Sequence, residues 1–500
     1  MNLASNLVRT AAHHADRPAV RLNDTIMTFQ DLDAASARVA GHLSERGLQP
    51  GDRVGIMLPN VPAFAVVYFG ALRAGCLVVP MNPLLKAREV AHYLADSDAR
   101  LIFASSAFAD EARKGAEVAD ADVIEVDAAG FAGVVASWPA RYDVAERAGD
   151  DTAVILYTSG TTGQPKGAEL THDNLARNTE AVCIDLLKLT PDDVVFGGLP
   201  LFHSFGQTVT LNAIAGSGAC LTLLPRFDPG QALHLLATHR VTVFAGVPTM
   251  YGALLNHPDR AEHDLSSLRL AVSGGAAMPV EVLRGFEDAF GCMVLEGYGL
   301  SETSPVASFN HPDRERKPGT IGMPIRGVEM KVVDDAGSEV PQGQVGEIAI
   351  RGHNIMKGYW RRPEATAAAI PDGWFRTGDM GRVDEDGYFS IVDRKKDLII
   401  RGGYNVYPRE IEEVLYEHPA VAEAAVIGLP HAQLGEEVGA AVALKPGATV
   451  TAEELRDFVK EQVAAYKYPR RVWFVATLPK GPTNKILKRE IVPPSEPATE

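Results

Sequence analysis

The stretch 157–167 constrains this chain most, because it sets a loop rich in glycine and hydroxyl groups between two apolar runs. It reads Tyr-Thr-Ser-Gly-Thr-Thr-Gly-Gln-Pro-Lys-Gly. Ala153–Leu156 precedes it and Ala168–Leu170 follows, which predicts strand, loop, strand. Glycines let backbone N–H groups turn toward one point, hydroxyls add donors and Lys166 adds a charge, so the loop suits a polyphosphate. It is not a Walker A loop, because proline precedes the lysine and glycine follows it.

In its order of residues this loop resembles the phosphate-binding signature of the acyl-adenylate-forming superfamily, which includes acyl-CoA synthetases, peptide adenylation domains and beetle luciferases. A flexible surface loop is the plain alternative. The resemblance implies that Lys166 and its neighbours bind the phosphates of ATP. Those neighbours are Thr158, Ser159, Gly160, Thr161, Thr162 and Gly163. Further motifs extend the resemblance from about Phe29 to Lys488, nearly the whole chain.

Length and composition limit the function classes. A chain of 500 residues is too long for one ordinary domain. Its 46% hydrophobic and 22% charged residues are typical of a soluble globular protein. The net charge of −16 disfavours nucleic-acid binding, which relies on basic patches. We therefore expect no nucleic-acid partner, while the resemblance implies a small-molecule carboxylic acid as substrate.

Cysteine usage and hydropathy bear on location. The 4 cysteines are widely spaced, with no Cys-x-x-Cys, so neither a disulfide framework nor a zinc site is indicated. This fits a cytoplasmic protein. No segment is long and apolar enough to span a bilayer, and peripheral membrane contact stays open. Monomer and homodimer also both stay open.

The pattern of elements predicts an α/β fold. Thr28 and Asp31 open a helix that Gly47 ends, and strands and helices then alternate, which favours parallel sheets covered by helices. Val123–Asp150 is expected to be less ordered. From about 319 to 393 helical periods vanish and short alternating strands predict an antiparallel, barrel-like subdomain. The remaining residues predict a small α+β domain, with Pro408–Glu417 as a helix.

The resemblance places two domains on this pattern. Residues 1–394 are expected to form the large adenylate-forming domain, and residues 395–500 a mobile lid hinged near Lys396. Five loops follow strand ends, where open α/β sheets bind ligands. They are Tyr157–Gly167, Leu201–Gln207, Gly246–Thr249, Ser273–Ala277 and Gly297–Thr303.

Site roles follow from the resemblance. Glu302, with Thr158, is expected to hold Mg²⁺, which prefers few carboxylates together with phosphate oxygens and water. Thr303 would contact the α-phosphate. A solvated loop glutamate is the plain alternative. Adenine would meet the loops that follow two strands, at Gly274, Gly275, Ala276, Glu296, Gly297, Tyr298 and Gly299. A core aromatic is the alternative for Tyr298.

Three charged side chains complete the expected nucleotide site. Asp379 would accept hydrogen bonds from the ribose hydroxyls, and Arg394 would add a ribose or phosphate contact. Lys485 would bridge the substrate carboxylate and the α-phosphate. The family usually has glycine where this chain has Asn484, a residue that tolerates left-handed backbone. His203 invites a general-base reading, but the resemblance makes it a gate between the acyl pocket and the thiol channel.

The implied reaction has two halves. A carboxylate attacks MgATP to form an acyl-adenylate and release pyrophosphate, and coenzyme A then displaces AMP. Lys485 cannot stay at the carboxylate while a thiol attacks there. The resemblance implies that the small domain rotates about a hinge, which by position is Lys396. The thiol channel would then be lined by Gly402, Gly403 and Tyr404, with Lys467 near the coenzyme's phosphates.

The substrate is read from the acyl pocket expected at His203, Phe205, Val247 and Gly297. No carboxylate stands in Leu201–Gln207, where amino-acid adenylation domains have one. Malonate-type enzymes have an arginine at the position of Gly297, so the glycine predicts an apolar cavity or tunnel. A medium- or long-chain fatty acid is therefore favoured. An aryl acid of the coumarate or benzoate kind and a malonyl-type acid are the alternatives.

Two other function classes share these motifs. A luciferase-like oxidative activity is compatible with all of them. A nucleotide-binding regulatory protein on a decayed scaffold is disfavoured, because Lys166, Glu302, Asp379, Arg394 and Lys485 are all present.

Overall fold

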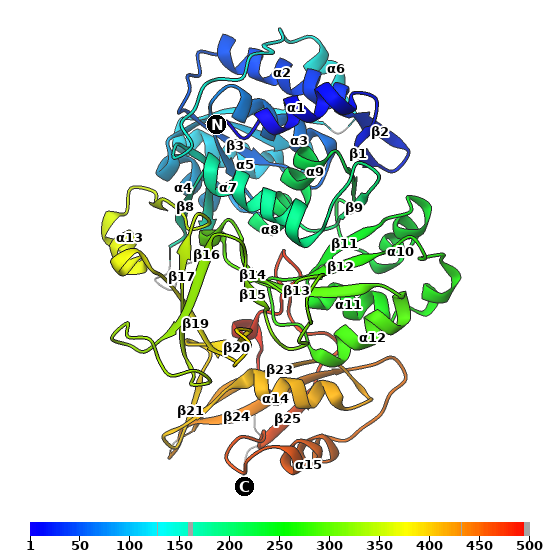
Figure 1. Cartoon of the computed structure of the whole chain (residues 1–500), viewed down its shortest axis with the longest axis vertical. Coiled ribbons are helices and arrows are strands. Elements are labelled where there is room, and N and C mark those ends of the chain that lie inside the picture. Colours follow the sequence, from blue (N-terminus) through cyan, green and yellow to red (C-terminus); the bar gives the residue numbers. More distant parts are fainter. Residues whose placement is uncertain (128, 159–163, 432, 495–500) are drawn as a thin grey trace.

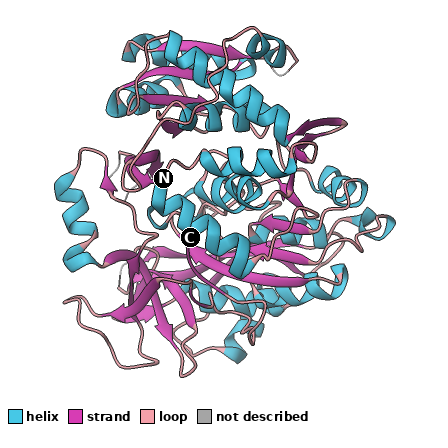
Figure 2. Ribbon diagram, turned by 45° about the horizontal axis from the view of Figure 1, so that its top comes forward, coloured by secondary structure: helices cyan, strands magenta, loops and turns pink. Residues whose placement is uncertain are grey.

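The computed structural model describes residues 1–127, 129–158, 164–431 and 433–494. Figure 1 shows the N-terminal elements at the top and most elements after residue 395 at the bottom, where α14 (Pro408–Glu417) and β23 (Val421–His431) contact elements of the upper part. Helices lie alongside strands throughout the upper part (Figure 2). This arrangement confirms the α/β prediction.

Two large sheets form the upper body. Within the described residues the first has nine strands, in the order β15-β14-β13-β12-β11-β9-β10-β1-β2. These strands are β1 (Pro18–Leu22), β2 (Thr25–Thr28), β9 (Val194–Gly197), β10 (Cys220–Leu223), β11 (Val243–Gly246), β12 (Leu270–Ser273), β13 (Met293–Gly299), β14 (Val306–Phe309) and β15 (Met323–Pro324). From β9 to β13 the pairs are parallel, so their carboxyl ends meet at one edge.

The second large sheet carries the phosphate-loop motif. Its seven described strands run β18-β8-β7-β4-β3-β5-β6. They are β3 (Arg53–Met57), β4 (Leu77–Pro80), β5 (Ala99–Ser105), β6 (Asp122–Val126), β7 (Thr152–Thr158), β8 (Lys166–Thr171) and β18 (Gly358–Tyr359). β7 and β8 pair antiparallel with Thr158 opposite Lys166, which confirms the two predicted strands and extends both of them into the stretch 157–167 that was expected to be loop.

Two smaller sheets follow. In the described chain the third sheet is β16-β17-β19-β20 and the fourth contains β22-β21-β24-β23, with β25 beside β24. Their bounds are β16 (Val328–Val333), β17 (Gly346–Gly352), β19 (Phe375–Val383), β20 (Phe389–Arg394), β21 (Ile399–Arg401), β22 (Tyr404–Val406), β23 (Val421–His431), β24 (Gly435–Leu444) and β25 (Arg471–Phe474).

The helices cover these sheets. They are α1 (Ser5–His14), α2 (Phe29–Glu45), α3 (Pro62–Arg73), α4 (Ala87–Ser97), α5 (Ala109–Ala119), α6 (Phe131–Ala136), α7 (His172–Glu180), α8 (Ser204–Gly206), α9 (Ala213–Ser217), α10 (Pro229–Thr238), α11 (Pro248–Leu255), α12 (Val280–Phe290), α13 (Pro363–Ala369), α14 (Pro408–Glu417) and α15 (Ala452–Gln462). The Thr28 hydroxyl accepts from the Asp31 N–H, which confirms the predicted start of α2. No described helix is long and apolar enough to cross a membrane.

The last hundred residues have a hydrophobic core of their own. Ile399, Ile411, Val426 and Leu455 belong to a cluster separate from the one that joins the two large sheets. A segment with its own core can move as a unit while keeping its internal packing. A core of this kind is what the predicted mobile lid, residues 395–500, requires.

Three expectations need correction. Val123–Asp150 contains most of β6 and all of α6, because Phe131 and Val135 bury against the large core, whereas residues 137–150 have no helix or strand, as expected. Helix α13 interrupts the antiparallel region, where helical periods had been expected to vanish. The four strands β16, β17, β19 and β20 are antiparallel as predicted, but they form an open sheet with β16 and β20 at its edges rather than a barrel.

Candidate active site

Glu302 collects hydroxyl groups from two distant segments. Its Oε1 accepts from the Thr158 hydroxyl at 3.2 Å and from the Tyr359 hydroxyl at 3.0 Å. The Glu302 residue is 8% exposed. The structure thus brings together the two residues predicted to hold Mg²⁺, one at the end of β7 and one just after β13.

Lys166 lies beside this cluster. Its ammonium is 5.2 Å from the centre of the Tyr359 ring. Thr158 and Lys166 face each other across β7 and β8, so the two ends of the phosphate loop are adjacent. Ser159, Gly160, Thr161, Thr162 and Gly163 lie outside the described residues.

Tyr298, Asp379 and Arg394 form a second cluster. The Tyr298 hydroxyl donates to Asp379 Oδ2 at 2.6 Å, and Arg394 Nε lies 3.3 Å from Oδ1. Asp379 and Arg394 are register partners on β19 and β20. Burial raises the pKa of Asp379, and Arg394 and Tyr298 oppose that shift. A buried carboxylate held between two donors can accept ribose hydroxyls from its remaining lone pairs.

Glycines let other groups approach the site. A Cβ on Gly274 would meet the Phe205 ring at 3.2 Å, and one on Gly275 would meet Lys485 Cε at 2.8 Å. Gly275 also has φ +80°, which L side chains rarely adopt. Ala276 follows in the same loop after β12. The predicted adenine loop therefore lies directly against the predicted adenylating lysine.

Lys485 reaches this place from the C-terminal part. Figure 1 shows the red segment near the C-terminus rising into the middle of the molecule, beside β13. Burial lowers the pKa of the Lys485 ammonium to about 8, with Arg394 adding to the shift and Asp379 opposing it. Asn484 has φ +58°, so it adopts the left-handed backbone for which the family uses glycine.

His203 is a neutral side chain in this structure. Its Nδ1 accepts from the Phe205 N–H at 3.3 Å, which caps the short helix α8. Burial, together with the Lys485 charge, lowers the pKa of His203 to about 3. A group that resists protonation this strongly is a poor general base near neutral pH. The geometry is compatible with the expected gate.

The expectation of a cavity at Gly297 needs correction. A Cβ on Gly297 would lie 2.1 Å from the ring of Phe309, its register partner on β14. The Phe309 side chain therefore fills the space that the missing side chain leaves. Phe205 and Val247, the other predicted acyl-pocket residues, are 9% and 2% exposed. The walls near the predicted pocket are apolar, as expected, but the space over Gly297 is filled.

Two predicted nucleotide contacts are engaged within the protein. The Thr303 hydroxyl has its one proton within reach of the Leu300 and Pro305 carbonyls, inside the turn after β13. A Cβ on Gly299 would collide with the Pro305 carbonyl, so this turn requires glycine. Glu296 accepts from the Met278 N–H at 3.0 Å through Oε1. Burial raises the pKa of Glu296 to about 7, and its Oε2 has no described hydrogen-bond partner.

The predicted thiol-channel residues are not at this site. Gly402 and Gly403, both with positive φ, turn β21 into β22, and the Tyr404 ring stacks on Tyr466. Figure 1 shows β21 on the outer side of the C-terminal part, away from β13. Lys467 pairs with Glu410 at 2.7 Å. Lys396 is exposed between β20 and β21, where the hinge was predicted.

The chemistry of these donors fits the nucleotide and its metal. One buried carboxylate with two neighbouring hydroxyls is what Mg²⁺ needs when phosphate oxygens and water complete its shell. No cluster of three or more acidic, histidine or cysteine side chains suited to a metal occurs among the described residues. Glu302, Thr158 and Lys166 would therefore serve a metal that arrives with its phosphates.

Three residues at the site escape sequence reasoning. Tyr359 lies in a two-residue strand that alternation does not predict, and Phe309 is recognised only from the pairing of β13 with β14. Thr249 contacts Asn484 across 235 positions. The sequence does carry a signal for Thr249, because this residue ends Gly246–Thr249, one of the five loops expected to bind ligands at strand ends.

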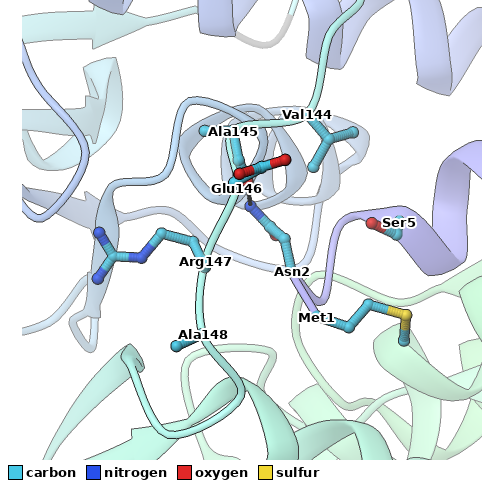
Figure 3. Close-up of a pocket in the computed structure, with 8 residues that line it drawn as sticks. All are labelled: Met1, Asn2, Ser5, Val144, Ala145, Glu146, Arg147 and Ala148. Atoms are coloured by element: carbon cyan, nitrogen blue, oxygen red, sulfur yellow. Dashed lines mark hydrogen bonds between the residues drawn. The ribbon is translucent and has the colours of Figure 1, made fainter.

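A separate hollow lies near the N-terminus. It has a volume of about 530 Å³ and is lined by Met1, Asn2, Ser5 and residues 144–148 (Figure 3). Asn2 donates to the Ala145 carbonyl at 3.0 Å, which ties the two segments together. None of its lining residues belongs to the predicted site.

Comparison with known proteins decides the family. A family model described as "AMP-binding enzyme" matches residues 7–360, and one described as "AMP-binding enzyme C-terminal domain" matches residues 410–485. This chain belongs to the AMP-binding enzymes. It is therefore an ATP-using ligase that joins an acid to a thiol with release of AMP.

Relatives span almost the whole chain. A long-chain-fatty-acid–CoA ligase of Bacillus subtilis is 38% identical, covering 98% of this chain and 94% of the relative. A feruloyl-CoA synthase of Amycolatopsis is also 38% identical, covering 98% of both chains. The ATP-bound crystal structure of MatB from Rhodopseudomonas palustris has a TM-score of 0.90 at 36% identity, covering 98% of each chain. Its apo structure has a TM-score of 0.82, covering 98% and 97%.

Proposed function

We propose that this AMP-binding enzyme activates a medium- or long-chain fatty acid as its acyl-adenylate and transfers the acyl group to coenzyme A. The observation that carries the proposal is the position of Lys485. Its side chain lies against Gly275, near enough to Asp379, Arg394 and His203 for the charges to interact. A cation at that place can meet a carboxylate and an α-phosphate together.

In the first half-reaction a carboxylate oxygen attacks the α-phosphorus and the bond to pyrophosphate breaks. Lys485 stabilises the negative charge that develops between the two reactants, while Asp379 and Arg394 hold the ribose. Lys166 and Glu302 face the departing phosphates, and bound Mg²⁺ supplies positive charge there. Positioning of the two reactants then accounts for most of the acceleration.

The second half-reaction requires a different arrangement. The sulfur of coenzyme A attacks the acyl carbon and AMP leaves with the electron pair of the broken C–O bond. Lys485 now occupies the approach, so we propose that residues 395–500 rotate as a lid about Lys396 and bring Gly402, Gly403 and Tyr404 to the site. The higher TM-score to the ATP-bound than to the apo form of MatB supports assigning this structure to the first half-reaction.

The apolar side chains around the expected acyl pocket support a fatty acid as the substrate. Phe205, Val247 and Phe309 are buried, and Gly297 offers no charge for a second carboxylate. The Bacillus subtilis relative supports a fatty acid. An aryl acid is the second candidate, because Phe309 covers Gly297 and narrows that end, and because one relative is a feruloyl-CoA synthase. A malonyl-type acid is less favoured for want of a cation at Gly297.

We propose that the enzyme acts in the cytoplasm. The described cysteines are free and buried, which suits a reducing cytoplasm. Monomer and homodimer remain equal expectations, and no nucleic acid is expected to bind.

Pyrophosphate release tests the function. The wild-type enzyme is given ATP, Mg²⁺ and a panel of saturated fatty acids, cinnamic and benzoic acids and malonic acid, with and without coenzyme A. We expect medium or long fatty acids to give the largest kcat/KM and acyl-CoA as the product by mass. Preference for aryl acids selects the second candidate, and no release with any acid contradicts both.

A further inference from the structure

The loop that carries Lys485 is tied to itself by hydrogen bonds. The Gly481 N–H donates to the Lys485 carbonyl at 2.9 Å, and the Asn484 N–H donates to the Gly481 carbonyl at 2.9 Å. Lys480 and Ile486 form a bridge at its base. These bonds shape the loop, but they do not tie it to the large domain.

The Asn484 carbonyl is the point where the loop meets the large domain. It accepts from the Thr249 hydroxyl at 2.5 Å. This carbonyl belongs to the peptide that leads into Lys485, and left-handed φ at Asn484 orients the residues on either side of it. A bond at this peptide therefore restrains the backbone from which the lysine projects.

Thr249 itself stands on a rigid element. It is the second residue of α11, which begins at Pro248 directly after Val247 and the buried strand β11. A Cβ on Gly275 would lie 3.6 Å from the Val247 side chain and 2.8 Å from Lys485 Cε. The start of α11 therefore lies close to the Lys485 side chain and, through Thr249, to the backbone that carries it. α11 also packs against β23 of the lid.

The lysine needs such a restraint. Within the described residues its ammonium forms no ion pair within 4 Å. Before the substrates bind, burial therefore disfavours the charged side chain at this place. A long flexible side chain on an untethered loop would leave for solvent, where its charge is hydrated.

We propose that Thr249 is a positioning residue for the first half-reaction, holding Lys485 in the adenylation site through its hydrogen bond to the Asn484 carbonyl. This inference rests on the proposed function. Because the lid carries Lys485 away before the thiol attacks, the bond breaks between the two halves. Thr249 therefore contributes to adenylation and not to thioester formation.

The test compares Thr249→Val with Thr249→Ser in the full-length enzyme. Valine keeps the shape of threonine and removes the donor, whereas serine keeps the donor. We expect Thr249→Val to lower kcat for acid-dependent ATP–pyrophosphate exchange roughly tenfold, since one hydrogen bond of about 1.4 kcal/mol is lost. KM for ATP should change little. Thr249→Ser should stay within about twofold of wild type.

A second substrate separates the two halves. Synthetic acyl-adenylate and coenzyme A are supplied to each variant, and thioester is measured by mass. We expect all three proteins to react alike. Exchange by Thr249→Val equal to wild type overturns the inference, and so does an equal loss in both half-reactions. Absence of exchange in the wild type with every acid counts instead against the proposed function.

The pH profile of ATP–pyrophosphate exchange separates a positioning role of Thr249 from a loss of stability, because a loss of stability would not shift the profile. In wild type, burial holds the pKa of Lys485 near 8. Exchange should fall as pH rises through that value, as the ammonium loses its proton. Arg394 lowers this pKa further, Asp379 opposes the lowering, and neutral His203 faces the same space. In Thr249→Val the lysine is partly solvated, so the alkaline limb should move to higher pH; an unmoved limb contradicts the tether.

Discussion

Burial controls the pKa of single residues at this site. Glu296 shows the effect most clearly, because one carboxylate oxygen accepts a backbone N–H and the other has no described partner. Burial raises its pKa from 4.5 to about 7, with Arg409 opposing the shift. Between these two values the folded protein holds a proton that the unfolded chain has lost. Stability contributed by Glu296 therefore falls as pH rises through this window.

Glu296→Gln should remove that pH dependence. The amide stays neutral, so the variant's free energy of unfolding, minus that of wild type, should increase by about 1–3 kcal/mol from pH 4.5 to pH 8. Taking the difference cancels the other titrating groups, which both proteins share. Urea unfolding at the two pH values measures it. A difference that is the same at both would show that Glu296 titrates normally.

Elements of the lid dock on the large domain at identifiable contacts. Glu413 on α14 accepts from the Val280 N–H, the first residue of α12, at 3.2 Å. Arg409 donates to the Ile391 carbonyl at 2.7 Å and its N–H to Asp393 at 3.0 Å. All these contacts join the segment after residue 395 to the part of the chain before it. Rotation about that connection would release them together and leave the core of the lid intact.

Lys396→Pro tests the connection, because proline fixes φ at about −65° and restricts the residue before it. We expect thioester formation to fall at least about tenfold while ATP–pyrophosphate exchange stays within about threefold. Lys396→Ala is the matched control, since it removes the same charge without stiffening the backbone, and should leave both rates near wild type. Equal losses in both reactions of the proline variant would argue against a hinge at Lys396.

Across the whole molecule, the sequence predicts what depends on local order and fails where distant segments meet. The order of neighbouring residues predicts three elements that the structure confirms. They are the two strands beside the phosphate loop, the capped start of α2 and the helix Pro408–Glu417. The position of the Phe309 ring over Gly297 depends on the register of β13 and β14. The hydrogen bond from Thr249 to Asn484 depends on how the two domains dock. Neither leaves a periodic signal.

The site roles divide in the same way. Tyr298 with Asp379, and Thr158 with Glu302, come from separate motifs that the resemblance assigns to one nucleotide site, and each pair lies within hydrogen-bonding distance. The thiol-channel residues stay a prediction, because the structure places the turn between β21 and β22 away from β13.

The most direct test of the account removes the amine of Lys485. In Lys485→Ala, acid-dependent ATP–pyrophosphate exchange should fall by at least about a hundredfold, because a charge that stabilises the transition state is lost. Thioester formation from supplied acyl-adenylate should continue near the wild-type rate. Equal loss of both half-reactions, or exchange that survives unchanged, would contradict the assignment of Lys485 to adenylation.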